Sequence, residues 1–425
     1  MTGIDQADRA ALSAMEQALA AAYTALKARG LSLDLTRGKP SGSQLDLADA
    51  LDGVLGGNYR DASGTDLRNY GGLDGLPEAK ALFAPVLQVP EANVLVGGNS
   101  SLTMMYQCLL YGMHFGLSGA DSAWSRSGTA KFICPVPGYD RHFGAAQHLG
   151  IELVTVPLTG HGPDMDAVEA LIDKDPTIRG MWCVPRFSNP TGEVYDAATV
   201  TRIAALGKRA HPDFRVFWDD AYAVHAFDAT APVLPSIWAA CEAAGTTDGV
   251  LLFGSTSKIT HAGAGVAFMA ASKANLTAIS GHLGYSSIGP DKVNQMRHVR
   301  LLKDAAGIAA HMEKHAALLA PRFAAVLKAL DEGLGGSGMG EWLRPQGGYF
   351  VSFDTRPGLA KEVVRLAAEA GVKLTPAGAT FPYGKDPQNR NIRIAPSFPS
   401  LKDIESAMEV FVACVKLASV RQALA

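Results

Sequence analysis

Along most of the chain, short runs of apolar residues alternate with longer segments in which apolar residues recur at helical spacing. The runs predict buried strands at 93–96, 132–134, 151–156, 180–184, 214–218 and 250–253, and the helical spacing predicts helices over 76–87, 102–111, 141–149, 165–172 and 197–209. Because strands separated by helices form βαβ units, this order predicts an α/β fold with a mainly parallel, doubly wound sheet.

Both ends of the chain have a different order of elements. Residues 5–29 show helical spacing, and 41–75 are rich in turn residues and predict a loop. The C-terminal part predicts helices over 307–333, 359–370 and 401–418 with strands at 347–353, 372–374 and 391–395. We therefore expect a large domain over 51–304 and a smaller α+β domain built from 1–50 and 305–425.

Composition and charge narrow the classes of function. Of the 425 residues, 48% are hydrophobic and 19% charged, and the net charge is -3. This is an ordinary globular composition with no sign of a nucleic-acid or anionic-membrane surface. The cysteines are scattered without metal-ligand spacing, and neither a signal peptide nor a long apolar run is evident. We expect a cytoplasmic protein without a metal, nucleic-acid or membrane partner.

One lysine stands where an expected strand ends. The run 250–253 is followed by Ser255, Ser257 and Lys258 and then by a loop rich in small residues. A lysine in a partly desolvated pocket has a lowered pKa and is a nucleophile towards an aldehyde. The hypothesis is a Schiff base between Lys258 and pyridoxal phosphate, with both serines donating to the phosphate. The alternative is a solvated loop lysine.

A second turn offers an anion site. Asn99, Ser100 and Ser101 lie between the strand at 93–96 and the helix at 102–111. Unpaired backbone N–H groups and the helix dipole favour a phosphate there, although most such turns bind nothing. Ligands of doubly wound sheets bind outside the carboxyl ends of the strands, where these turns lie.

The order of four motifs resembles that of a known family. Asn189-Pro-Thr-Gly192, Asp219-x-Ala-Tyr222, Ser255-x-Ser-Lys258 and Asn391-Ile-Arg393 follow one another as in the fold-type-I, aminotransferase-class pyridoxal phosphate enzymes. The residue sequences of 135–143 and 258–266 are similar to those of the bacterial aspartate aminotransferase subgroup called Ic. The resemblance covers nearly the whole chain.

The resemblance implies roles around the cofactor ring. Asp219 would keep the pyridine nitrogen protonated so that the ring withdraws electrons, and His142 would support that carboxylate. Asn189 and Tyr222 would donate to the ring oxygen, and Tyr139 would stack on the ring. For Asp220 the resemblance implies no role, and it is read as a turn residue.

It also implies a second subunit and a way to hold the substrate. Tyr70 would reach the phosphate from the neighbouring subunit, which predicts a homodimer with sites at the interface. Arg393 would clamp the substrate α-carboxylate together with Asn189, Gly38 would allow close backbone approach, and Lys258 would move a proton from Cα.

One position departs from the pattern of many related enzymes. They carry a phosphate-binding arginine eight residues after the lysine, where this chain has Val266.

The activity that the resemblance implies is aspartate aminotransferase, which moves the amino group of L-aspartate to 2-oxoglutarate by a ping-pong mechanism. A dicarboxylate needs a second cation, and the candidates are Arg37, Lys39, Arg141 and Arg297. The alternatives are an aminotransferase for aromatic or other amino acids and a pyridoxal phosphate lyase. A third alternative, a regulator on this scaffold, is disfavoured because only about thirty residues precede Leu31, too few for a DNA-binding domain.

Overall fold

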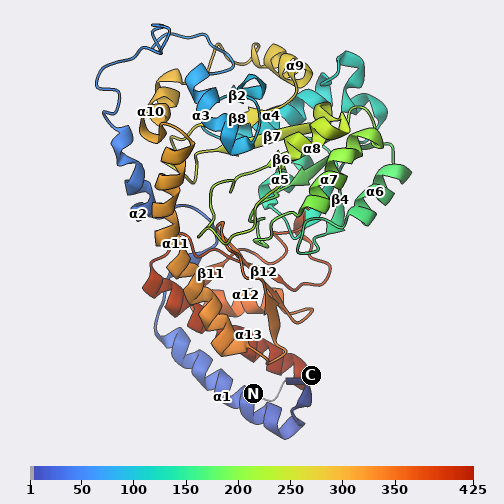
Figure 1. The fold of residues 1–425 in the computed structure, drawn as a ribbon. Coiled ribbons are helices and arrows are strands. Elements are labelled where there is room, and N and C mark those ends of the chain that lie inside the picture. Colours follow the sequence, from blue (N-terminus) through green and yellow to red (C-terminus); the bar gives the residue numbers. More distant parts are fainter. Residues whose placement is uncertain (1–3) are drawn as a thin grey trace.

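The protein is an α/β protein built on a mainly parallel sheet of seven strands in the order β2-β8-β7-β6-β5-β3-β4. A computed structural model describes residues 4–425 (Figure 1). Only β8 runs antiparallel to its neighbours. The strands are β2 (Val94–Val96), β3 (Lys131–Val136), β4 (Glu152–Pro157), β5 (Ile178–Cys183), β6 (Arg215–Asp219), β7 (Val250–Ser255) and β8 (Ala267–Ala270).

Helices cover both faces of this sheet because successive strand residues point to opposite sides. In β6, Phe217 packs with α4, α5 and α9, whereas Val216 and Trp218 pack with the helices of the other face. The expected doubly wound arrangement is therefore confirmed. The helices are α3 (Pro77–Leu87), α4 (Ser101–His114), α5 (Asp140–His148), α6 (Met165–Lys174), α7 (Ala197–Ala205), α8 (Ile237–Ala244), α9 (Lys273–Leu283) and α10 (Lys292–Leu302).

A smaller α+β domain has a hydrophobic core of its own, and the N-terminal helix α1 packs into this core as expected. The long helix α11 joins the two cores, since Ile308 and Met312 belong to the first and Phe323 and Val326 to the second (Figure 1). The exact boundaries at 50/51 and 304/305 stay a prediction. The elements are α1 (Arg9–Ala28), β1 (Leu33–Leu35), α11 (Ala305–Leu334), β9 (Gly340–Trp342), β10 (Val351–Thr355), α12 (Ala360–Glu369), β11 (Val372–Leu374), β12 (Asn391–Ile394) and α13 (Leu401–Leu424).

The structure differs from the sequence prediction in the expected loop over 41–75. This segment begins with the short helix α2 (Gly42–Leu45), where Ser41 and Gln44 form a capping box, and a 3₁₀ helix over Asp46–Leu51 follows. The strand expected at 347–353 begins only at Val351, because Gly348 has a positive φ of 78°. Within residues 4–425, every helix is too short or too polar to cross a bilayer.

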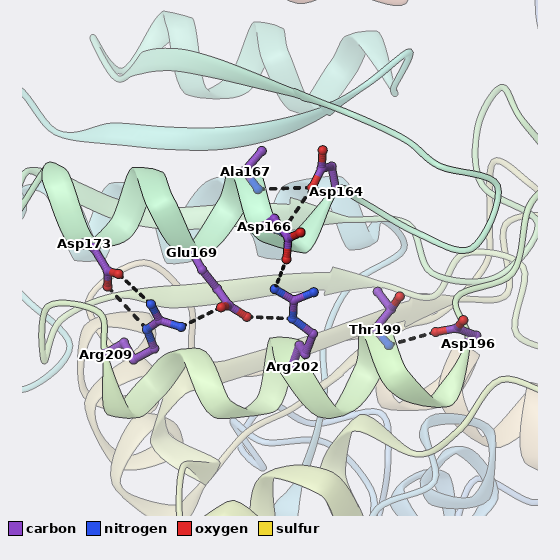
Figure 2. Close-up of polar contacts among 9 residues, drawn as sticks. All are labelled: Asp164, Asp166, Ala167, Glu169, Asp173, Asp196, Thr199, Arg202 and Arg209. Atoms are coloured by element: carbon purple, nitrogen blue, oxygen red, sulfur yellow. Dashed lines mark hydrogen bonds and ion pairs between the residues drawn. The ribbon is translucent and has the colours of Figure 1, made fainter.

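Helices α6 and α7 are joined on their outer side by a network of charges (Figure 2). Glu169 of α6 accepts from Arg202 Nε at 2.8 Å and from Arg209 Nη1 at 2.6 Å. The two arginines also pair with Asp166 and Asp173 at 2.6 and 2.5 Å. Hydrogen bonds from Arg202 lower the pKa of Glu169 below its usual range. Glu169 therefore links both arginines and is the centre of the network.

We expect Glu169→Gln to lower the free energy of unfolding by about 1 kcal/mol at low ionic strength, because two charged partners lose one carboxylate. This loss of stability should be smaller at high salt, because salt screens the attraction between Glu169 and the two arginines in the wild-type protein. Urea unfolding at low and high salt measures both effects. Asp121→Asn is the control, since it removes an isolated ion pair between the fully exposed Asp121 and the exposed Arg126. An equal loss in both variants would contradict the network.

Candidate active site

A cavity of about 740 Å³ lies where the parallel strands end and the smaller domain begins. Parallel strands bring their carboxyl ends to one edge, so the loops after β2, β3, β5, β6 and β7 meet there. The predicted site residues that line it are Gly38, Ser100, Ser101, Tyr139, Asn189, Asp219, Tyr222, Ser255, Ser257, Lys258 and Arg393.

Two residues predicted to contact the cofactor do not belong to this lining. Asn99 turns its side chain to the loop after Lys258, where Nδ2 donates to the Gly263 carbonyl at 3.2 Å. Tyr70 is 79% exposed on the surface of the single chain. Its expected contact with a neighbouring subunit stays a prediction.

Lys258 lies half-buried in the wall of the cavity, at the start of the turn that follows β7. The turn is held because Ile259 and Thr260 donate their amides to the Thr256 carbonyl at 2.9 Å, and Val266 donates its amide to Thr256 Oγ1 at 2.8 Å. The ammonium lies 5.0 Å from the centre of the Tyr222 ring. Burial lowers the pKa of Lys258, and the negative charge of Asp219 offsets part of this effect. The lysine thus has the environment of a nucleophilic amine.

Asp219 is held by one neighbour and keeps one oxygen free. Its Oδ2 lies 2.9 Å from His142 Nε2, and the His142 ring stacks on Trp182 with centroids 4.2 Å apart. Among the residues described, Asp219 Oδ1 is buried without a hydrogen-bond partner. An unpaired buried carboxylate oxygen is costly, so the site is built to accept a hydrogen bond from a bound group.

Arg393 extends from β12 into the opposite side of the cavity. Its Nη1 donates to Asp140 Oδ1 at 3.0 Å and to Asn189 Oδ1 at 3.2 Å, and its guanidinium lies 4.9 Å from the centre of the Phe350 ring. Its Nε is buried and has no partner in the described part of the chain. The arginine is therefore pre-positioned with donor capacity left for an anion.

Gly38 has a steric reason to be glycine. A Cβ atom at this position would lie 2.4 Å from the Phe350 ring, the ring that supports Arg393. A side chain here would displace the ring that lies against the arginine.

The serines lie together at the end of the cavity near the sheet. Ser255 Oγ and Ser257 Oγ are 3.1 Å apart, and Ser100 caps helix α4 by accepting from the Thr103 amide. The first turn of α4 and these hydroxyls offer donors to a phosphate. Val266 is buried in the hydrophobic core at the start of β8 and does not line the cavity. An arginine in its place would have to leave that core.

Sequence reasoning missed three contributors to the site. Asp140, Trp182 and Phe350 hold Arg393 or His142, but each belongs to a segment distant from its partner in sequence. A tryptophan in a buried strand gave no local signal of such a role. Of the proposed second cations, Arg37, Lys39 and Arg141 line the cavity and Arg297 does not.

The comparisons with known proteins agree with this geometry. A family model described as aspartate amino-transferase matches residues 7–425. The aspartate aminotransferase of Corynebacterium glutamicum is 48% identical over 398 residues, which cover 93% of this chain and 92% of that protein.

Solved structures show the same relationship. The crystal structure of an aspartate transaminase from Corynebacterium glutamicum has a TM-score of 0.96 and 45% identity, and covers 99% of both chains. An α-aminoadipate aminotransferase of Thermus thermophilus shares the fold, with a TM-score of 0.75 and 23% identity over 93% of this chain and 95% of that one. The chain therefore belongs to the aspartate aminotransferase family and is an aminotransferase.

Proposed function

We propose that this aminotransferase transfers the amino group of L-aspartate to 2-oxoglutarate with pyridoxal phosphate held at Lys258. The observation that carries the proposal is the amine of Lys258, whose pKa is lowered, in one cavity with the free oxygen of Asp219 and the guanidinium of Arg393. A nucleophilic amine, a carboxylate for a protonated ring and a clamp for a carboxylate are the parts that such a reaction requires.

The residues present fit pyridoxal phosphate. Asp219 Oδ1 would accept from the protonated ring nitrogen, and Tyr139, an aromatic residue of the lining, would stack on the ring. Ser100, Ser255 and Ser257 would donate to the phosphate together with the N-terminus of α4. When bound, the cofactor supplies an aldehyde and an electron-withdrawing ring that stabilises negative charge at the substrate Cα.

The protein's own groups then bind the substrate and move its proton. Arg393 would grip the α-carboxylate through two donors, which fixes the Cα–H bond for removal. Lys258 would take the Cα proton as general base, since its lowered pKa gives a larger neutral fraction at pH 7. Tyr222 and Asn189 would donate to the ring oxygen. The carboxylate of Asp140 now on Arg393 would share that arginine with the substrate.

The second carboxylate of a dicarboxylic substrate needs a cation of its own. Arg37, Lys39 and Arg141 line the cavity, and Lys39 Nζ lies 4.0 Å from the centre of the Phe398 ring. All three cations are exposed at the cavity. Their positive charge supports a dicarboxylate over an aromatic or aliphatic substrate, because it attracts a second carboxylate and not an uncharged side chain.

We also propose a homodimer. Tyr70, Tyr285 and Ile288 are large hydrophobic residues that are 79%, 94% and 69% exposed. Lys292 donates to the carbonyls of Asn69 and Gly71 on either side of Tyr70, at 2.8 and 2.6 Å. The loop thus presents Tyr70 outward in a defined conformation, which suits the predicted contact with a second subunit. The cytoplasmic location stays a prediction.

The test of the proposed function is an absorbance titration of the purified protein with pyridoxal phosphate. We expect a visible band from the covalent adduct at Lys258, its conversion to a near-ultraviolet band with L-aspartate, and its return with 2-oxoglutarate. Lys258→Ala should bind the cofactor without forming the adduct. A band that ignores aspartate would refute the substrate, and absence of any adduct would refute the role of Lys258.

We expect Asp219→Asn to lower kcat by about 100-fold or more, because the charge that keeps the ring protonated is lost. The covalent adduct should still form, since Lys258 is unchanged. Asp220→Asn is the matched control: Asp220 is buried beside it, and burial raises its pKa to about 7, so its charge is already partly absent. Steady-state kinetics of the two variants gives the loss of kcat in each. An equal loss in both would contradict the role of Asp219.

Removing the cation that binds the distal carboxylate should raise KM for aspartate and spare alanine, which lacks that carboxylate. We expect one of Arg37→Met, Lys39→Met and Arg141→Met to lower kcat/KM for aspartate by about 10- to 100-fold, the range of a lost charged hydrogen bond. The ratio of kcat/KM for aspartate to kcat/KM for alanine in each variant identifies the cation that binds the distal carboxylate. If all three variants lose both activities equally, the dicarboxylate preference has another origin.

A further inference from the structure

A cluster of buried polar groups lies behind Lys258, and the proposed mechanism does not use it. His225, His311 and His315 are 3%, 7% and 0% exposed. They do not line the cavity. Gln44 and Tyr349 complete the cluster, and both are fully buried.

Two of these rings contact the backbone that carries the lysine. His225 Nε2 lies 3.2 Å from the Lys258 carbonyl oxygen, and His311 Nε2 lies 2.6 Å from the Ile259 carbonyl oxygen. A carbonyl oxygen only accepts hydrogen bonds, so both Nε2 atoms carry hydrogen. Successive peptide carbonyls are thus held by two imidazoles.

The tautomer of the third ring follows from Gln44. The Ser41 amide donates to Gln44 Oε1 at 3.1 Å, which identifies the other terminal atom of Gln44 as its nitrogen. That nitrogen donates to Tyr349 Oη at 2.9 Å and to His315 Nδ1 at 3.2 Å. His315 Nδ1 therefore has no hydrogen, and the neutral ring carries it on Nε2.

The two rings of α11 contact each other. His311 Nε2 and His315 Nε2 are 3.2 Å apart. His311 Nε2 donates to the Ile259 carbonyl, so His315 contacts the ring that holds this carbonyl. Burial lowers the pKa of His315 to about 4 and that of His225 to about 3, and it lowers that of His311 as well. All three rings are neutral at pH 7.

The cluster links three parts of the chain that surround the cavity. His311 and His315 belong to α11, which joins the two cores. Gln44 belongs to α2, directly after the segment 36–39 that lines the cavity. The Ile259 carbonyl belongs to the lysine turn. From Gln44, polar contacts through His315 and His311 reach the Ile259 carbonyl, which follows Lys258 in the chain.

We propose that His311 and His315 are positioning residues for the Lys258 turn: His311 holds the Ile259 carbonyl, and His315, whose tautomer is set by Gln44, supports His311. The inference rests on the proposed role of Lys258 as the cofactor-binding amine. Held in place, the turn keeps the amine desolvated beside Tyr222 and Asp219, the groups that face it. If the turn loosened, water would reach the amine and its pKa would rise.

The test compares His311→Leu, which removes the donor, with His311→Gln, whose amide nitrogen can replace Nε2. In the cofactor-free protein, hydrogen exchange of peptides covering 256–261 should be about tenfold faster in His311→Leu and near the wild-type rate in His311→Gln. Lys258 is then reacted with pyridoxal phosphate over a range of pH and trapped with borohydride. We expect the midpoint to rise by about one pH unit in His311→Leu.

Gln44→Leu is the second variant and remains informative if His311→Leu does not fold. It frees His315 to change tautomer. The hydrogen exchange of 256–261 should therefore become faster and the pH midpoint of the Lys258 reaction should rise, as in His311→Leu. Thr246→Val is the control, because it removes a buried hydrogen bond to the Ala204 carbonyl at the opposite end of β7 from this turn. It should lower the free energy of unfolding without changing the hydrogen exchange of 256–261 or the pH midpoint of the Lys258 reaction.

The outcomes separate the two proposals. Unchanged exchange and midpoint in His311→Leu and Gln44→Leu, with a normal wild-type adduct, would overturn the positioning role alone. Equal changes in Thr246→Val would also overturn it, because general loss of stability would then explain them. Absence of a wild-type adduct, with faster exchange only in the cluster variants, would refute the proposed function and leave the hold on the turn established.

Discussion

The rest of the site depends on the partial removal of the Lys258 amine from water. A buried ammonium is unfavourable unless it is paired or loses its proton, and here burial shifts the lysine towards the neutral, nucleophilic form while Asp219 limits the shift. The sheet makes this burial possible, because β7 ends in the middle of the sheet with β6 and β8 on either side. The turn that follows has its amides bonded internally.

Two polar atoms near the lysine are left unpaired within residues 4–425, which destabilises the ligand-free protein but leaves them available to a ligand. Asp219 Oδ1 and Arg393 Nε are both buried without partners among the residues described, and each such atom costs about 1–3 kcal/mol. The neighbouring contacts keep these two groups oriented: His142 holds the carboxylate, and Asp140, Asn189 and Phe350 hold the arginine. A bound cofactor and substrate would satisfy the remaining atoms without moving the groups.

Helix α11 gives the two domains a common rigid element. Its first half packs on the core of the large sheet and its second half on the core of the smaller domain. The same first half carries His311 and His315 beneath the lysine turn. One helix thus contacts both the lysine turn and the core of the domain that provides Arg393.

The sequence alone determined the α/β sheet and brought Lys258, Asp219, Asn189 and Tyr222 to one edge, because parallel strands share the side on which their carboxyl ends lie. It did not reveal β8, which has only four residues, or α2, whose capping box stands in a turn-rich segment. Only the tertiary structure decided which residues meet across the domains. The contact of Asp140 with Arg393, the approach of Gly38 to Phe350 and the histidine cluster join residues far apart in the chain. Such contacts follow from how the two cores pack, and no local periodicity encodes them.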